Sequence, residues 1–147
     1  MRHRVDKKKL NMPHDQRVAL LKNLAREVFE HGNVITTKTK AKVVKPFVES
    51  IITKGKKAYN YSKEIEEKRE DSSVQEIVAK NVSIRRQINR NFGDRKLVKK
   101  ICDDIAPKYI DRNGGYTRIL NIGTRRGDAA ELVILQLVDE SVSKNKE

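Results

Sequence analysis

The sequence has one cysteine, no tryptophan and no long apolar run, and each scarcity excludes a class of protein. A lone Cys102 cannot form an internal disulfide, and its spacing to the three histidines fits no zinc-ligand pattern. No stretch approaches the ~20 apolar residues that a membrane-spanning helix needs, and lysines follow the basic N-terminus where a signal peptide has its apolar segment. We therefore expect a protein of a reducing, cytoplasmic setting that neither crosses a membrane nor is exported.

Positive charge, in contrast, is abundant. The 147 residues include 33 Lys and Arg against 20 Asp and Glu, a formal net charge of +13. The first 57 residues hold 15 of these basic residues against 5 acidic ones, so they carry most of the excess. Charged residues make up 36% of the chain and aromatic residues 5%, so much of the surface must be solvated or matched by opposite charge. This distribution is typical of a protein that lies against a polyanion.

The charge pattern also divides the chain. Residues 1–13 have no apolar period and read as a flexible basic arm that orders only on a partner. Residues 14–139 suffice for one modest core, so we expect a single domain there. An acidic segment at about 60–80 looks inserted into it, because residues 58–80 hold 4 basic and 6 acidic residues. A charged tail follows at 140–147.

Three segments have the apolar period of an amphipathic helix. The first is expected to run from a cap at Asp15 to a stop at Gly32. The second is expected to start near Thr39 and to continue past Pro46. The third is expected to run from a cap at Asp94 to a stop at Ala106 and Pro107. Lysines crowd the start of the second helix, where the helix dipole disfavours cations unless a phosphate lies near. A short helix is expected in the acidic segment, after a capping box at Ser73 to Glu76. Cys102 falls beside the third apolar stripe as a buried structural thiol.

β-Branched and aliphatic residues mark three strands, at 33–37, 116–122 and 132–138. The last two predict an antiparallel hairpin with a long basic tip, and the first is able to add a further strand. The expected fold class is α+β, with three main helices packed on one face of a small, mostly antiparallel sheet.

Several basic positions suit contact with phosphates. At the tip, Arg125 and Arg126 beside Gly127 combine forked guanidinium groups with flexible backbone, although a solvated hairpin tip is the alternative. Tyr116 either stacks on RNA or packs in the core. The basic runs 85–90 and 95–100 are, taken alone, typical of solvated helix faces. Because basic groups occur on many elements, an irregular folded RNA suits the chain better than a DNA major groove.

Catalytic patterns are weak. No Ser-His-Asp or Cys-His arrangement has supporting context, and Asp103 and Asp104 are adjacent and so point away from one another on a helix. A dipole contact at a helix end explains His31. We expect no enzyme, cofactor, metal or small-molecule substrate. Two other classes stay open: a DNA architectural protein, which needs a dimer surface or apolar wedge, and an RNA-processing enzyme, which needs an acid and base pair.

Several separated motifs, in order, resemble the L17 family of bacterial large-ribosomal-subunit proteins. They are Met1-Arg2-His3-Arg4, Leu10-Asn11, Arg17 and Asn23, Ile35-Thr36-Thr37 before Lys40-Ala41-Lys42, Gly114-Gly115-Tyr116-Thr117-Arg118-Ile119, and Arg126-Gly127-Asp128-Ala129-Ala130 before Glu131-Leu132-Val133. The resemblance covers roughly residues 2–58 and 82–139. The chain departs from shorter members of the family near residues 60–80 and in its tail.

The resemblance implies a noncatalytic constituent of the large subunit, in the cytoplasm, that binds large-subunit ribosomal RNA near the nascent-chain tunnel exit beside neighbouring ribosomal proteins. The acidic segment is expected to project outward, toward solvent or a neighbouring protein. The residues expected to contact RNA are Arg2, His3, Arg4, Lys7, Lys8, Lys9, Asn11, Arg17, Lys22, Asn23, Arg26, Thr37, Lys38, Lys40, Lys42, Arg118, Thr124, Arg125 and Arg126.

Overall fold

The computed structural model describes residues 8–68 and 74–138. The elements, in chain order, are α1 (His14–His31), β1 (Asn33–Thr37), α2 (Lys38–Glu67), α3 (Val74–Phe92), α4 (Arg95–Lys99), the π-helical turn η1 (Lys100–Ile105), the 3-10 turn η2 (Ala106–Tyr109), β2 (Thr117–Thr124) and β3 (Glu131–Leu137). Predictions for Arg2, His3, Arg4, Lys7, Ser73 and the tail lie outside the described residues. The α+β class is confirmed.

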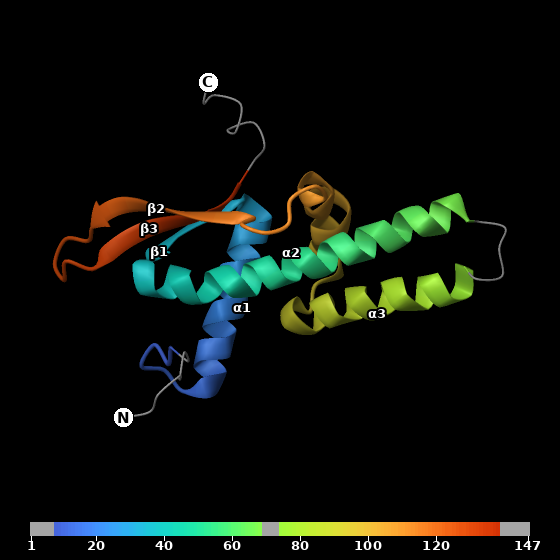
Figure 1. Ribbon diagram of the computed structural model, residues 1–147. Helices are drawn as coiled ribbons and strands as arrows, with labels where there is room; N and C mark the ends of the chain where they lie inside the picture. The colour runs from blue at the N-terminus through green and yellow to red at the C-terminus, as the bar shows by residue number, and fades with distance from the viewer. Residues whose placement is uncertain (1–7, 69–73, 139–147) are drawn as a thin grey trace, which may run out of the picture.

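The sheet has the order β1-β3-β2 with both pairings antiparallel, so the predicted hairpin and its additional strand are confirmed. Figure 1 shows the three strands lying over the N-terminal half of α2, while α1 crosses α2 below them. Val133 and Leu135 of β3 are buried against these helices. On the opposite face Ile35 and Leu120 are exposed, which confirms that the helices cover one face only.

Helix α1 forms where the apolar period predicts it, and it buries Ala25, Val28 and Phe29. It ends at Gly32, whose φ of +80° is a left-handed conformation that glycine adopts without strain. The predicted cap is wrong, because the helix begins at His14 and its capping position is held by Pro13. A proline suits the entry to a helix, since the first backbone amides have no partner within the helix.

Helix α2 is longer than its sequence indicates. It passes through Pro46, as predicted, and continues through 30 residues to Glu67. Gly55 does not end it. A Cβ there would lie 3.3 Å from the Cβ of Ala106, so glycine permits close packing of α2 against η2.

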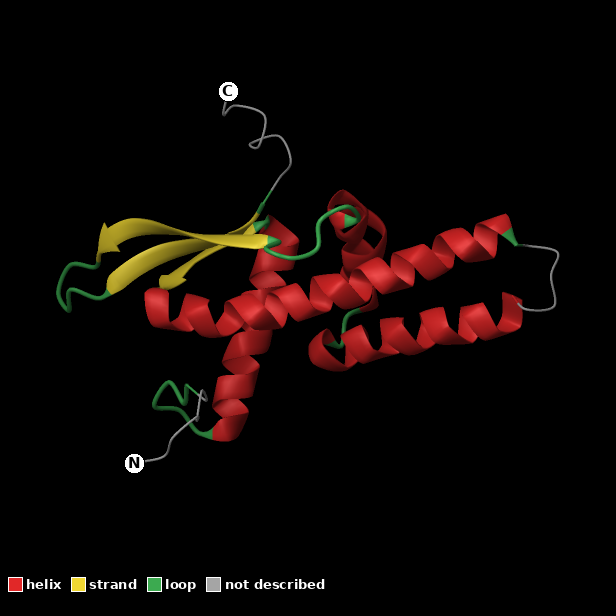
Figure 2. Ribbon diagram, in the orientation of Figure 1, coloured by secondary structure: helices red, strands yellow, loops and turns green. Residues whose placement is uncertain are grey.

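The acidic segment contributes the end of a helical hairpin that Figure 2 shows extending away from the sheet. The expected short helix is the start of α3, which has 19 residues and packs along α2. Its inner face buries Ile88 and Phe92 in the core. The basic run 85–90 therefore belongs to α3.

Asp94 caps α4 as predicted, because its Oδ1 accepts hydrogen bonds from the backbone amides of Lys96 at 2.8 Å and Leu97 at 3.3 Å. The segment beyond Lys99 is not regular α-helix. It continues as the π-helical turn η1 and then as the 3-10 turn η2, and Pro107 lies in the first turn of η2. The predicted stop at Ala106 agrees with the end of η1 at Ile105, but the sequence did not predict that η2 follows directly, where proline is tolerated because a new turn begins.

Candidate nucleic-acid interface

Residues expected to contact RNA meet where the end of the basic arm lies against the start of α2. A cleft of about 380 Å³ is lined there by Lys8, Leu10, Asn11, Thr37, Thr39 and Lys40. Leu10 and Asn11 both have positive φ, at 55° and 51°, and the Met12 amide donates to the Lys9 carbonyl at 3.2 Å. This turn brings the arm back to α2.

The first turn of α2 has the properties of an anion site. Thr37 occupies the capping position in an extended conformation with no side-chain capping hydrogen bond, and the first turn has no acidic residue. The backbone amides there have no partner within the helix, and they favour negative charge. Lys40 lies in this first turn and Lys42 in the next, and Lys42 is exposed. Together these groups suit a phosphate.

Lys38 has a second role, because its Nζ lies 2.7 Å from the Oε2 of Glu131. This hydrogen bond and the charge of Lys38 lower the pKa of the Glu131 carboxyl. The pair joins the start of α2 to the start of β3. It links the sheet to α2 and partly neutralises this one lysine.

The hairpin tip, residues 124–130, is a shaped turn. The guanidinium of Arg125 forms an ion pair with the carboxylate of Asp128, with the Nε donating to Oδ1 at 3.0 Å. The side-chain hydrogen bond from Arg125 and a backbone one from Ala130 lower the pKa of Asp128 to about 2. Arg126 is exposed and has no ion pair among the described residues. Arg125 thus holds the turn while Arg126 projects from it.

Of the α1 residues predicted to contact RNA, some bond other parts of the protein and others lie at the surface. Arg26 donates from its guanidinium to the Phe92 carbonyl, which satisfies the end of α3. Arg17 bonds the Nδ1 of His14 at 3.2 Å, and Asn23 is exposed. Lys22 is half-buried in a shallow groove near the helix start.

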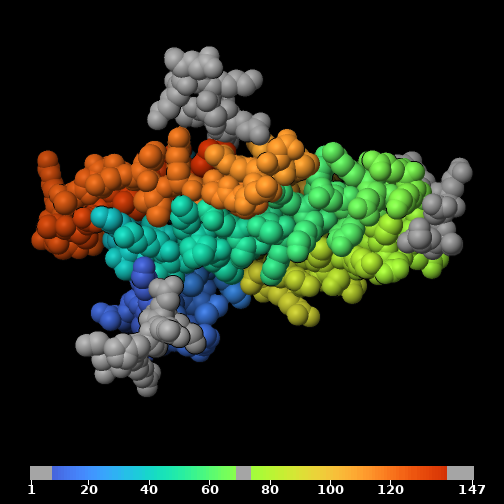
Figure 3. Space-filling model, viewed as in Figure 1, coloured from blue at the N-terminus to red at the C-terminus, as the bar shows by residue number. Residues whose placement is uncertain are grey.

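Arg118 lies on the open face of the sheet. With the Gln136 amide oriented to accept, the guanidinium bonds its oxygen at 2.5 and 2.6 Å across β2 and β3. Thr124 ends β2 at the exposed tip. Figure 3 shows the tip, the first turns of α2 and the described part of the arm at the same end of the molecule.

Tyr116 belongs to the core. Its ring is 4% exposed and packs edge-on against Tyr109, with 5.4 Å between the ring centroids. The Nζ of Lys56 lies 5.3 Å from the Tyr116 centroid and donates to its hydroxyl at 3.3 Å. Of the two interpretations that the sequence leaves open, the structure supports packing.

Some basic residues from 85 to 100 bond other parts of the protein and others are exposed. The sequence did not distinguish the two groups. The guanidinium of Arg85 is half-buried and bonds Asp103 at 2.6 Å, so Arg85 is not part of a solvated face. Lys100 donates to the Glu30 carbonyl at 2.9 Å. No local sequence signal distinguishes Arg85 from Arg86, because the partner of Arg85 lies on another helix.

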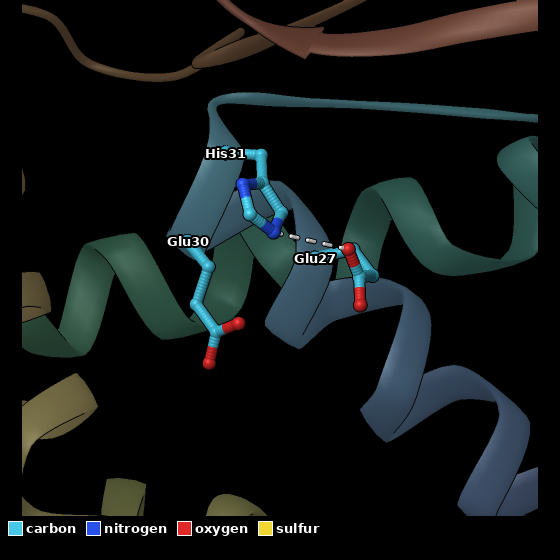
Figure 4. A group of neighbouring side chains, drawn as sticks. All are labelled: Glu27, Glu30 and His31. Carbon is cyan, nitrogen blue, oxygen red and sulfur yellow. Dashed lines mark ion pairs between the residues drawn. The ribbon is translucent and has the colours of Figure 1, made fainter.

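One group of side chains in the described residues has the composition of a metal site. Glu27, Glu30 and His31 surround the end of α1, with ligand atoms within 4.8 Å of one another (Figure 4). The Nε2 of His31 lies 3.5 Å from the Oε2 of Glu27, and these side chains are 66% and 51% exposed. Ion pairs at this spacing are common on helix surfaces, and nothing else at the site indicates a metal.

Cys102 is buried, as predicted, and burial raises the pKa of its thiol to about 11. His14 and His31 lie on α1 with no nucleophile against them in the described contacts. Within residues 8–68 and 74–138, no helix is long and apolar enough to span a membrane.

Comparisons with known proteins all identify the same family. The family described as ribosomal protein L17 matches residues 20–138. The large ribosomal subunit protein bL17 of Kosmotoga olearia is 67% identical, over all of this chain and 99% of its own length. The proteins of the same name from Petrotoga mobilis and Fervidobacterium nodosum are 55% and 48% identical, over 94% and 95% of this chain and 97% and 100% of their own lengths.

Proposed function

The chain belongs to the ribosomal protein L17 family, and from this premise we propose that it is a structural constituent of the large ribosomal subunit in the bacterial cytoplasm. It binds folded large-subunit ribosomal RNA near the nascent-chain tunnel exit, beside neighbouring ribosomal proteins. It supports translation without catalysis, since the family is a noncatalytic component of the ribosome.

The observation that carries the RNA-binding proposal is the convergence of basic groups at one end of the molecule. The described part of the arm, residues 8–13, the start of α2 and the hairpin tip all lie on the side of the molecule away from the α2–α3 hairpin (Figure 1). The contact residues proposed there are those predicted from the sequence. Arg26, Lys38 and Arg125 each also have a partner in the protein, so they position the surface as well as carry charge.

Physically, the proposal is that lysines and arginines neutralise phosphates where RNA segments converge. Release of condensed counterions supplies much of the affinity, and this component weakens as salt rises. The folded core fixes the spacing of the contacts and thereby selects which segments meet. No base-reading helix is required.

The test is the salt dependence of binding to large-subunit ribosomal RNA, for the full chain and for a variant lacking residues 1–11. We expect the truncation to weaken binding and to flatten the plot of log affinity against log salt by roughly 0.7 to 0.9 for each phosphate that the protein no longer neutralises. A control for charge removed elsewhere is Lys63→Gln, which removes one exposed lysine in the distal part of α2. An unchanged slope on truncation would refute the role of the arm.

A further inference from the structure

A second basic site lies outside the proposed interface, between α3 and α4. It is a cleft of about 430 Å³ whose lining includes Val82, Arg86, Asn89, Arg95, Val98 and Lys99. The ion-paired residues Arg85 and Asp103 complete its lining. Figure 1 places α3 in the half of the molecule away from the hairpin tip, so the cleft is separate from the arm surface.

The charge of this cleft is not matched by the protein. Of the residues that the structure describes in its lining, Asp103 alone is acidic, and Arg85 neutralises that carboxylate. The side chains of Arg86, Arg95 and Lys99 are exposed, and none has an ion pair or hydrogen bond to another described residue. Three cations with no protein partner around one cavity favour an anionic ligand.

The floor of the cleft is apolar. Val98 is 5% exposed at its base, and Val82 is 38% exposed on the α3 wall. A bare phosphate gains nothing from an apolar floor, whereas a planar base covers it. Arginine side chains on both walls are suited to stack on such a base, because guanidinium groups are planar and weakly hydrated.

One residue of the lining carries an unsatisfied polar group. Asn89 lines it, and the Oδ1 of Asn89 is buried with no hydrogen-bond partner among the described residues. A buried acceptor without a donor is costly. The terminal torsion of asparagine is broad, so rotation of the amide presents it to the edge of a base in the cleft.

We propose that this cleft binds one unpaired RNA nucleotide, with its base against Val98 on the floor and Val82 on the wall, and its phosphate held by the surrounding cations. Unstacked bases of this kind are the usual targets of specific RNA recognition. The choice of RNA rests on the proposed function. The cleft is a second RNA contact, distant from the arm, at which the protein binds a looped-out nucleotide.

The test is an NMR titration of the ¹⁵N-labelled full chain with four separate probes. These are adenosine monophosphate, uridine monophosphate, inorganic phosphate and a hexaglutamate peptide. We expect at least one nucleotide to shift the amide signals of Val82, Asn89 and Val98, and inorganic phosphate at equal concentration to shift them much less. Equal shifts with inorganic phosphate, or stronger shifts with hexaglutamate, would overturn the proposal, as would no shifts with either nucleotide.

Two variants on the same helix sharpen the test. Arg86→Ala removes a cleft cation and should weaken nucleotide binding about tenfold, as expected when one charge-assisted hydrogen bond is removed. Arg90→Ala removes an exposed arginine of α3 that does not line the cleft, so its affinity should match that of the unsubstituted chain. Both positions are exposed, and both variants should remain folded. Equal losses in the two variants would contradict binding in the cleft.

Asn89→Ala gives an independent measurement. It removes a buried acceptor that has no partner in the free protein, so the variant should be at least as stable as the unsubstituted chain. Nucleotide binding should nevertheless weaken, whereas unchanged binding would exclude the amide from recognition. Failure of this proposal can be distinguished from failure of the proposed function. A chain that binds nucleotides in the cleft but does not associate with large subunits would support the cleft proposal and contradict the ribosomal role.

Discussion

The guanidinium of Arg85 lies 2.6 Å from the Oδ1 of Asp103, and this ion pair joins α3 to η1. The same guanidinium bonds the Oδ1 of Asn81 at 3.1 Å and the hydroxyl of Ser62 at 3.4 Å. Asn81 in turn donates to Ser62 at 2.9 Å. One arginine thus connects α2, α3 and η1, and it holds the helical hairpin against the rest of the core.

Arg85→Ala should lower the free energy of unfolding by about 1 to 3 kcal/mol, because it leaves several half-buried polar groups without their partner. Arg86→Ala, one residue later and exposed, should change it by less than ~0.5 kcal/mol. Urea denaturation of both variants measures the difference. Equal stability of the two variants would show that the ion pair contributes nothing to the fold.

The hairpin tip should keep its shape in acid. Because the pKa of Asp128 is lowered from 3.8 to about 2, its ion pair with Arg125 is fully formed above pH 3.8 and is lost as the pH falls through about 2. An NMR titration of the Asp128 carboxyl carbon should therefore have its midpoint near 2. A midpoint near 4 would mean that Arg125 is free in solution.

Cys102 should react slowly with a thiol reagent in the folded protein. Burial raises the pKa of the thiol to about 11, so the reactive thiolate is scarce at neutral pH. Its reaction with 5,5′-dithiobis(2-nitrobenzoate) at pH 8 should accelerate strongly when urea unfolds the chain. Fast reaction in the native state would place the thiol at the surface.

Lysines at the start of α2 should contribute more to RNA affinity than lysines in the α2–α3 hairpin. Replacing Lys40 and Lys42 with Gln should weaken binding to large-subunit RNA and reduce the salt slope by about 1.4 to 1.8 if each contacts one phosphate. Lys63→Gln together with Lys80→Gln removes the same charge from the α2–α3 hairpin and should leave the slope unchanged. This control also tests the prediction that the acidic segment projects away from RNA.

Elements whose pattern is local were predictable from the sequence. The apolar period of α1 with its stop at Gly32, the cap at Asp94 and the β-branched runs of the three strands each depend on residues close in the chain. These signals also sufficed for the sheet hairpin and for the expectation that helices cover a single face of the sheet.

Features that depend on a distant partner were not predictable. No local signal marks the end of α2 at Glu67, in the part of the helix that packs along α3, or the close approach of Gly55 to Ala106. Arg85 and Arg86 are neighbours with identical side chains, yet only Arg85 faces Asp103. The cleft between α3 and α4 exists only after these helices are packed.

The most direct test of the ribosomal role is sedimentation of a cell lysate through a sucrose gradient at moderate salt, with each fraction probed for this protein. We predict that it co-migrates with the large ribosomal subunit, and that removal of residues 1–11 releases it at lower salt than the full chain requires. A peak at the top of the gradient, or one that follows DNA, would contradict the account.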